Sequence, residues 1–118
     1  MMISLRGCII WDNVRLADTP WSRLRGLLGR QGMMPGEGLI LTPCNQVHGF
    51  FMKFPIDLVF LDRDHYVMAI DRLDPWRISP LVRRARAVLE VPCGTAGDRI
   101  KPGDQLELAS SATGGTQS

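Results

Sequence analysis

The hydrophobic and polar positions of this chain follow the two-residue period of β-strands along most of its length. Near the N-terminus apolar side chains occupy odd positions with polar residues between them: Ile3, Leu5, Ile9 and Trp11. This alternation is typical of a half-buried strand. Further strand-length apolar runs lie at 14–17, 39–41, 46–52, 58–61, 66–73, 87–91 and 105–108. The pattern predicts about seven short strands.

One segment carries the signals of a helix instead. Thr19 can act as the N-cap with Pro20 at the first helical position, where its missing N–H costs nothing. The apolar positions that follow form one stripe: Trp21, Leu24, Leu27 and Leu28. Gly29 suits the C-cap. We therefore predict one helix near residues 20–28.

The turns complete a prediction of the fold class. Asp12-Asn13 reads as a turn before a returning strand, and residues 63–65 suit a hairpin turn. Residues 101–104 form another turn, whereas 74–84, with two prolines, read as a long irregular excursion. We predict a mostly β (β-rich α+β) fold, a small curled antiparallel sheet or open barrel of about seven short strands with one helix.

Length and composition fit one small domain. The chain has 118 residues, of which 45% are hydrophobic and 22% charged, close to globular averages. We assign residues 1–109 to a single domain and expect the polar tail, 110–118, to be disordered.

The charge balance argues against nucleic acid as a partner. Fourteen basic and 12 acidic residues leave a formal net charge of +2, well short of a basic footprint. The densest basic runs, 23–30 and 83–86, are either anion-binding patches or solvated faces. The sequence contains no run of about 18 apolar residues, the length that a membrane-spanning helix needs. We therefore expect a soluble, cytoplasmic protein with no membrane partner.

The three cysteines bear on the redox state. Cys8, Cys44 and Cys93 are an odd number, which favours reduced thiols over a disulfide framework. The sequence alone does not decide whether Cys44 and Cys93 form a disulfide bridge.

Five segments in fixed order resemble a known family. They are TPWSRLRGLLGR (19–30), GEGLILTPC (36–44), FFMKFPIDLVFLD (50–62), ARAVLEVPCG (85–94) and KPGDQLEL (101–108). Together they resemble the domain of unknown function 192 family of uncharacterised small bacterial and archaeal proteins. The resemblance covers residues 5–108 and implies a compact domain, mainly of β-strands with one or more short helices, and no established activity. The Cys-x-x-x-His before the Phe-Met-Lys segment resembles one branch of that family.

Residues 44–64 concentrate the candidate chemistry. Cys44 could be a nucleophile activated by His48, since a nearby base or cation lowers a thiol pKa. Four residues of extended chain span roughly 13 Å, so the two side chains meet only if the chain bends at Pro43 or Gly49. Otherwise Cys44 is a small buried residue and His48 a hydrogen-bonded strand residue.

A metal site is a second interpretation of the same residues. Zinc or copper would need at least three convergent ligands, of which Cys44 and His48 supply two. Cys93, Asp57 and His65 are the remaining candidates. We expect no cofactor, with zinc as the one possibility to test.

Other polar and aromatic residues extend the candidate site. Lys53 and Asp57 flank a proline-containing segment and could form an ion pair there. Arg25 and Arg30 could face the same candidate site and bind an anion there. Trp76 lies in the irregular excursion, where it either covers the core edge or forms a binding lip.

Two functional classes follow from these residues. The favoured one is a small non-enzymatic binding or accessory module with a groove near residues 44–57 that holds a small ligand or a protein segment. The proposed lining is His48, Lys53, Asp57, Trp76 and Arg25. The alternative is a thiol- or metal-dependent enzyme centred on Cys44 and His48.

Overall fold

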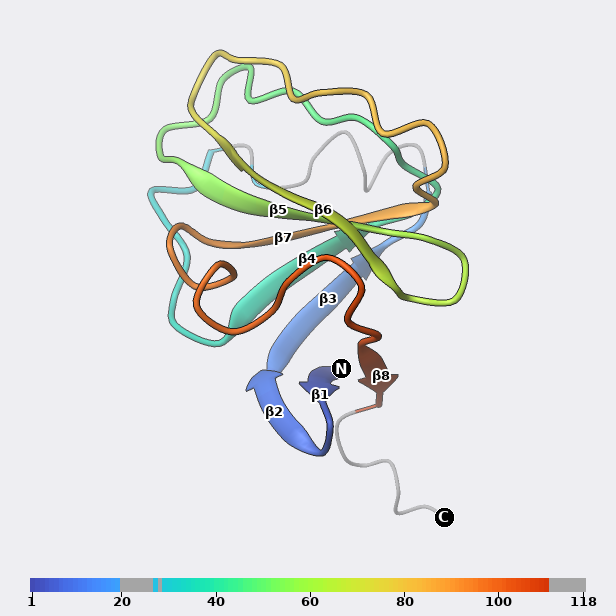
Figure 1. Cartoon of the computed structure of the whole chain (residues 1–118). Coiled ribbons are helices and arrows are strands. Elements are labelled where there is room, and N and C mark those ends of the chain that lie inside the picture. Colours follow the sequence, from blue (N-terminus) through green and yellow to red (C-terminus); the bar gives the residue numbers. More distant parts are fainter. Residues whose placement is uncertain (20–26, 28, 111–118) are drawn as a thin grey trace.

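The protein, described here from a computed structural model of residues 1–19, 27 and 29–110, has eight strands and no helix within those ranges. Three strands form a small sheet in the order β2-β1-β8, with bounds Cys8–Trp11, Met2–Leu5 and Glu107–Ala109. Five form a larger sheet in the order β3-β4-β7-β5-β6, with bounds Asn13–Ala17, Glu37–Leu41, Ala87–Pro92, Ile56–Leu61 and Val67–Leu73. The prediction of a mostly β fold is confirmed (Figure 1).

The small sheet begins with a hairpin that the alternation did not reveal. Arg6 and Gly7 adopt φ angles of 51° and 83°, as a tight turn between β1 and β2 requires. A bulge places Ile3 opposite Trp11, and both are fully buried. The turn and the bulge reset the faces, since Ile9 lies opposite Ser4 and is 55% exposed, although the odd-numbered apolar pattern resembles that of a single strand. The prediction of one strand over 3–11 was wrong for this reason.

The larger sheet is mostly antiparallel but contains one parallel pair, which the sequence did not indicate. β3 pairs parallel with β4, and Asn13 aligns with Glu37. A parallel pair needs a long crossover, which here spans residues 18–36. The helix predicted near residues 20–28 lies in this crossover and, apart from Leu27, outside the described residues.

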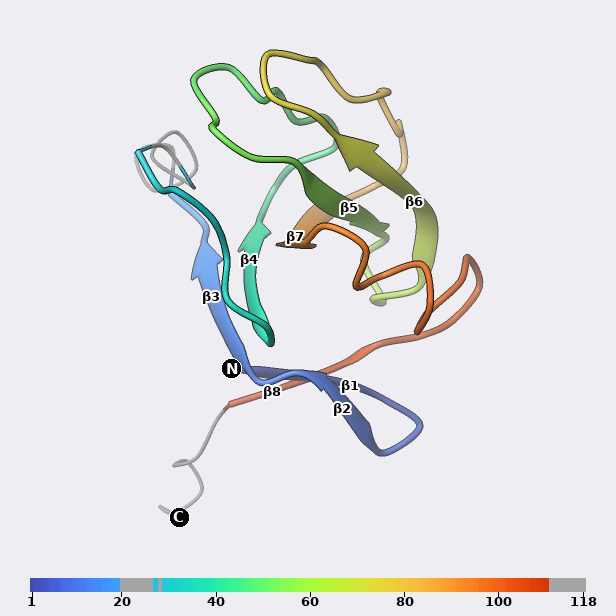
Figure 2. The same cartoon turned by 90° about the vertical axis from the view of Figure 1, so that its left-hand side faces the viewer.

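The sheets do not close into a barrel. β3 and β6 are the edges of the larger sheet, and the small sheet lies beneath it (Figures 1 and 2). β4 and β5 are buried along their whole length, so both faces of the larger sheet are covered. One face carries a core that includes Trp11, Val59 and Leu89, and the other a core that includes Leu58, Phe60 and Val88.

Two irregular segments cover the face that carries Leu58 and Phe60. Residues 44–52 and 76–86 run antiparallel and lie side by side above the larger sheet (Figure 1). Backbone bonds join Gly49 N to Arg77 O at 2.8 Å and Ser79 N to Val47 O at 2.8 Å. We call residues 44–52 and 76–86 the paired segments. The predicted strand over 46–52 is instead this loop, with one isolated bridge between His48 and Ile78.

The predicted turns are confirmed where they connect strands. His65 N bonds to Asp62 O at 3.0 Å between β5 and β6, and Asp104 N bonds to Lys101 O at 3.1 Å. Nothing in the described ranges is a helix long and apolar enough to cross a membrane. The predicted tail, 110–118, lies outside the described residues except for Ser110.

Candidate functional site

The paired segments bring four rings together at the protein surface. The His48 and Phe50 ring centroids lie 4.8 Å apart, and those of Phe51 and Trp76 lie 4.7 Å apart. Phe50 and Trp76, at 6.1 Å, connect the two pairs. These distances are within the range of favourable aromatic contacts. We call His48, Phe50, Phe51 and Trp76 the aromatic cluster.

The cluster is exposed although three of its four residues are large apolar aromatic side chains. Phe51 is 66% exposed and Trp76 58% exposed, whereas Trp11 and Phe60 are 1% and 0% exposed. Exposed aromatic groups of this kind mark contact sites more often than isolated surface residues do. The Trp76 side chain is therefore largely exposed and does not fill the core.

The backbone of the cluster adopts a costly conformation. Phe51 and Trp76 have φ angles of 66° and 67°, a region that non-glycine residues occupy at a cost of about 1–3 kcal/mol each. Gly49 O accepts bonds from Met52 N at 3.1 Å and Trp76 N at 2.7 Å, which fixes both conformations. A Cβ on Gly49 would lie 2.8 Å from Asp74 O, so only glycine fits at this crossing.

His48 belongs to the cluster through its ring. It is exposed, and its Nδ1 accepts a bond from Phe50 N at 3.4 Å. Lys53 and Arg77 are exposed next to the cluster in sequence. The structure thus brings together His48 and Trp76, two of the residues that the sequence nominated.

Asp57 is not part of this group. It is buried in β5, where its Oδ2 accepts bonds from Gly94 N at 2.8 Å and Ala96 N at 3.2 Å. Lys53 and Asp57 form no ion pair, although the structure describes both. The carboxylate instead holds the turn after β7, which explains its burial without a role in the aromatic cluster.

Cys44 and His48 do not form a dyad. The Cys44 thiol donates to Gln46 O at 3.2 Å, so each of the two side chains bonds two residues along its own segment. Buried and exposed side chains also do not alternate here as in a strand. Val47, at an odd position, and Met52, at an even one, are both buried, whereas His48 is exposed. The bends at these positions break the expected two-residue period.

The described residues offer no ligand set for zinc or copper. Nowhere in the described ranges do three His, Cys, Asp or Glu side chains group closely enough to hold a metal ion. Cys93 is exposed and lines a hollow of about 460 Å³ with Asp57 and Asp98, away from the Cys44 segment. No disulfide joins Cys44 to Cys93.

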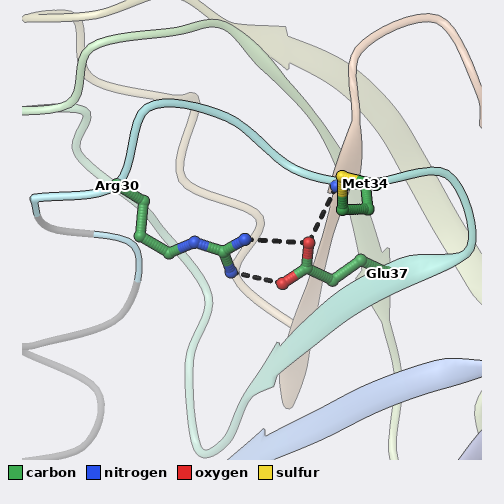
Figure 3. A network of polar contacts seen from close by, with 3 residues as sticks. All are labelled: Arg30, Met34 and Glu37. Carbon is green, nitrogen blue, oxygen red and sulfur yellow. Dashed lines mark hydrogen bonds and ion pairs between the residues drawn. The ribbon is translucent and has the colours of Figure 1, made fainter.

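The arginines nominated for an anion have different positions. Arg25 lies outside the described residues. Arg30 makes a two-pronged ion pair with Glu37, which also accepts a bond from Met34 N at 2.8 Å (Figure 3). The guanidinium lowers the pKa of the Glu37 carboxyl, which in turn raises the pKa of Arg30. Arg30 is therefore neutralised by the protein itself.

Glu90 is a notable residue that sequence reasoning missed. It lies in central strand β7, is 4% exposed, and burial raises its pKa to about 8. Within the described ranges its carboxyl forms no ion pair and no side-chain hydrogen bond. The available signal was a single acidic residue inside the apolar run AVLEVP, which a buried strand seldom contains.

Comparisons with protein families and with known proteins identify relatives of the same kind. The family of domain of unknown function 192, described as "Uncharacterized ACR", matches residues 4–108. A UPF0127 protein of Pyrococcus horikoshii is 34% identical over 116 residues, which cover 91% of this chain and 97% of that protein.

Solved structures share the fold. A protein of unknown function from Novosphingobium aromaticivorans superposes with a TM-score of 0.78 at 27% identity, over 91% of this chain and 82% of that one. A Sinorhizobium meliloti protein described as a candidate transcription regulator gives 0.68 at 26% identity, over 80% and 79%. The expected kinship is confirmed: this chain belongs to the domain of unknown function 192 family.

Proposed function

We propose that the protein is a small non-enzymatic binding module that contacts a partner polypeptide through the aromatic cluster. The observation that supports this most directly is the exposure of Phe51 and Trp76 on a backbone held at positive φ. Folding alone gains little from exposing large rings in a strained conformation, and such strain concentrates at functional sites.

The shape of the surface favours a polypeptide over a small ligand. Small ligands bind in concave pockets, and three hollows formed by described residues have linings without a member of the aromatic cluster. Aromatic side chains are also enriched among the residues that dominate protein–protein affinity. Exposed Ile78, which pairs with His48, extends the apolar contact area.

The enzyme interpretation has less support. The Cys44 thiol and the His48 ring each bond within their own segment, and neither acts on the other. As part of the same proposal we assign the module to the cytoplasm. The support is that Cys8, Cys44 and Cys93 are all thiols, as expected in a reducing compartment.

A displayed library of random peptides tests the proposal. Peptides selected on the intact chain should lose about tenfold or more in affinity for Trp76→Ala and for Phe51→Ala, because each change removes a large contact ring. Ile9→Ala and Leu16→Ala remove exposed apolar side chains elsewhere, 55% and 47% exposed, and should leave affinity unchanged. If all four variants bind alike, the aromatic cluster is not the contact surface.

A further inference from the structure

A second surface, at the other end of the paired segments, is rich in arginine. β5 ends beside the start of β7, since Leu61 pairs with Ala87 and Arg86 N bonds to Leu61 O at 2.8 Å. Two tight turns, 62–65 and 82–85, extend beyond this end. Both turns line one hollow, the first with Arg63 and the second with Arg83 and Arg84.

The hollow has a volume of about 460 Å³, the size of a small-ligand site. Its lining includes four exposed arginines: Arg63, Arg83, Arg84 and Arg86. Arg83 and Arg86 also line a neighbouring hollow of about 380 Å³ beside Cys44. Arginines from two turns therefore line one concave surface.

The positive charge of this hollow is not balanced by the protein. The ion pairs of the described residues involve Arg6, Arg30 and Arg72, and none of the four arginines that line the hollow. Of the two aspartates in the lining, Asp62 uses one oxygen to accept bonds from Asp64 N at 2.8 Å and Tyr66 N at 2.9 Å. The lining carries an excess of two positive charges, as many as the whole chain.

We infer that this hollow, which we call the arginine hollow, binds a phosphate group. Arginine presents paired N–H donors that match phosphate oxygens, and a concave surface of one charge sign concentrates the field on a small anion. The phosphate of a small soluble compound and that of a phospholipid headgroup share this chemistry. The inference is independent of the aromatic cluster.

Two binding experiments distinguish a soluble phosphate compound from a phospholipid headgroup. Calorimetry measures the binding of pyrophosphate, and cosedimentation measures binding to vesicles of phosphatidylcholine with phosphatidic acid. We expect saturable one-site binding of pyrophosphate that weakens about tenfold or more in Arg83→Gln/Arg84→Gln. Arg15→Gln/Arg77→Gln removes the same charge elsewhere and should weaken binding less than about threefold. Binding only to vesicles, with the same dependence on Arg83 and Arg84, would support the lipid as the source.

Arg63→Gln, on the facing turn, is a second variant in case the double substitution does not fold, and it should also weaken binding. The inference is overturned if neither pyrophosphate nor vesicles bind, or if the two double variants lose affinity equally. A single-stranded oligonucleotide that binds more tightly than pyrophosphate, with equal losses in both double variants, would also overturn it, because that behaviour reports only overall charge.

Discussion

Phe51 and Trp76 show what a single residue can hide from sequence analysis. Their hydrophobicity favours burial. Nothing in their identity indicates a positive φ angle, a conformation that glycine and asparagine adopt more readily than other residues. Their conformation depends on Gly49, whose carbonyl oxygen accepts bonds from Trp76 N and from Met52 N, the residue after Phe51. The sequence nominated Trp76 because it lies among prolines, but the contact with Phe51 depends on long-range pairing.

Gly49→Ala should disturb this crossing. The added Cβ would lie 2.8 Å from the Asp74 carbonyl oxygen, a backbone atom that cannot move freely. We expect a loss of about 1–3 kcal/mol in the free energy of unfolding, measured by chemical denaturation. Gly97→Ala is the matched control, since nothing lies within 4 Å of its added Cβ. Equal stability of the two variants would contradict the crossing as described.

Glu90 gives the stability a predictable pH dependence. In the unfolded chain its carboxyl releases a proton near its ordinary pKa of 4.5, whereas the folded protein retains that proton up to about pH 8. Between these values only the unfolded form is ionised, so rising pH favours unfolding. The stability that the protonated Glu90 carboxyl gives to the folded state is fully present below about pH 4.5 and is lost by about pH 8.

Glu90→Gln should remove this dependence. In the wild type we expect Glu90 to lower the free energy of unfolding by about 1.4 kcal/mol per pH unit over that interval. The glutamine variant should show a flatter profile and greater stability at pH 8, measured by denaturation at several pH values. Glu107→Gln changes an exposed carboxyl and should retain the wild-type slope. A wild-type slope in Glu90→Gln would show that the carboxyl titrates normally.

At the scale of elements, local patterns predicted most strands but not their partners. The buried runs of β4, β5 and β7 and the turn at 62–65 depend on neighbouring residues, so the sequence indicated them correctly. The parallel pairing of β3 with β4 depends on the crossover at 18–36, which no local period records. The loop at 46–52 was predicted as a strand because its apolar residues do pack, but in an irregular order.

The ion pair between Arg30 and Glu37 should stabilise the end of that crossover. Arg30→Ala leaves a buried carboxylate with only its backbone bond to Met34, and we expect a loss of about 1–2 kcal/mol in unfolding free energy at pH 7. The pair lowers the pKa of Glu37, so its contribution is present above about pH 4.5 and is lost as pH falls below it. The difference between the wild type and Arg30→Ala, measured by denaturation, should therefore shrink in acid.

Arg30→Lys retains the charge but not the two-pronged geometry, and its stability should lie between those of the other two proteins. A difference that stays constant from pH 7 to pH 3 would contradict an electrostatic role for the pair.

At the scale of the whole molecule, two stacked sheets carry separate surfaces at the two ends of the paired segments. Family resemblance predicted the mainly β domain, but the sequence placed Asp57 in the groove when its carboxylate holds the turn after β7. Alternation cannot show which loops meet above a sheet, because contacts such as Gly49 with Arg77 join distant parts of the chain. The sequence therefore named His48 and Trp76 but not the aromatic cluster in which they lie.

Backbone NMR of the chain, titrated with a peptide selected on it, tests the central claim most directly. If the aromatic cluster is the contact surface, the largest chemical-shift changes will lie at residues 48–51 and 75–77. Residues of the arginine hollow, 83–86, will shift little. Changes concentrated elsewhere, with residues 48–51 and 75–77 unaffected, would contradict the account.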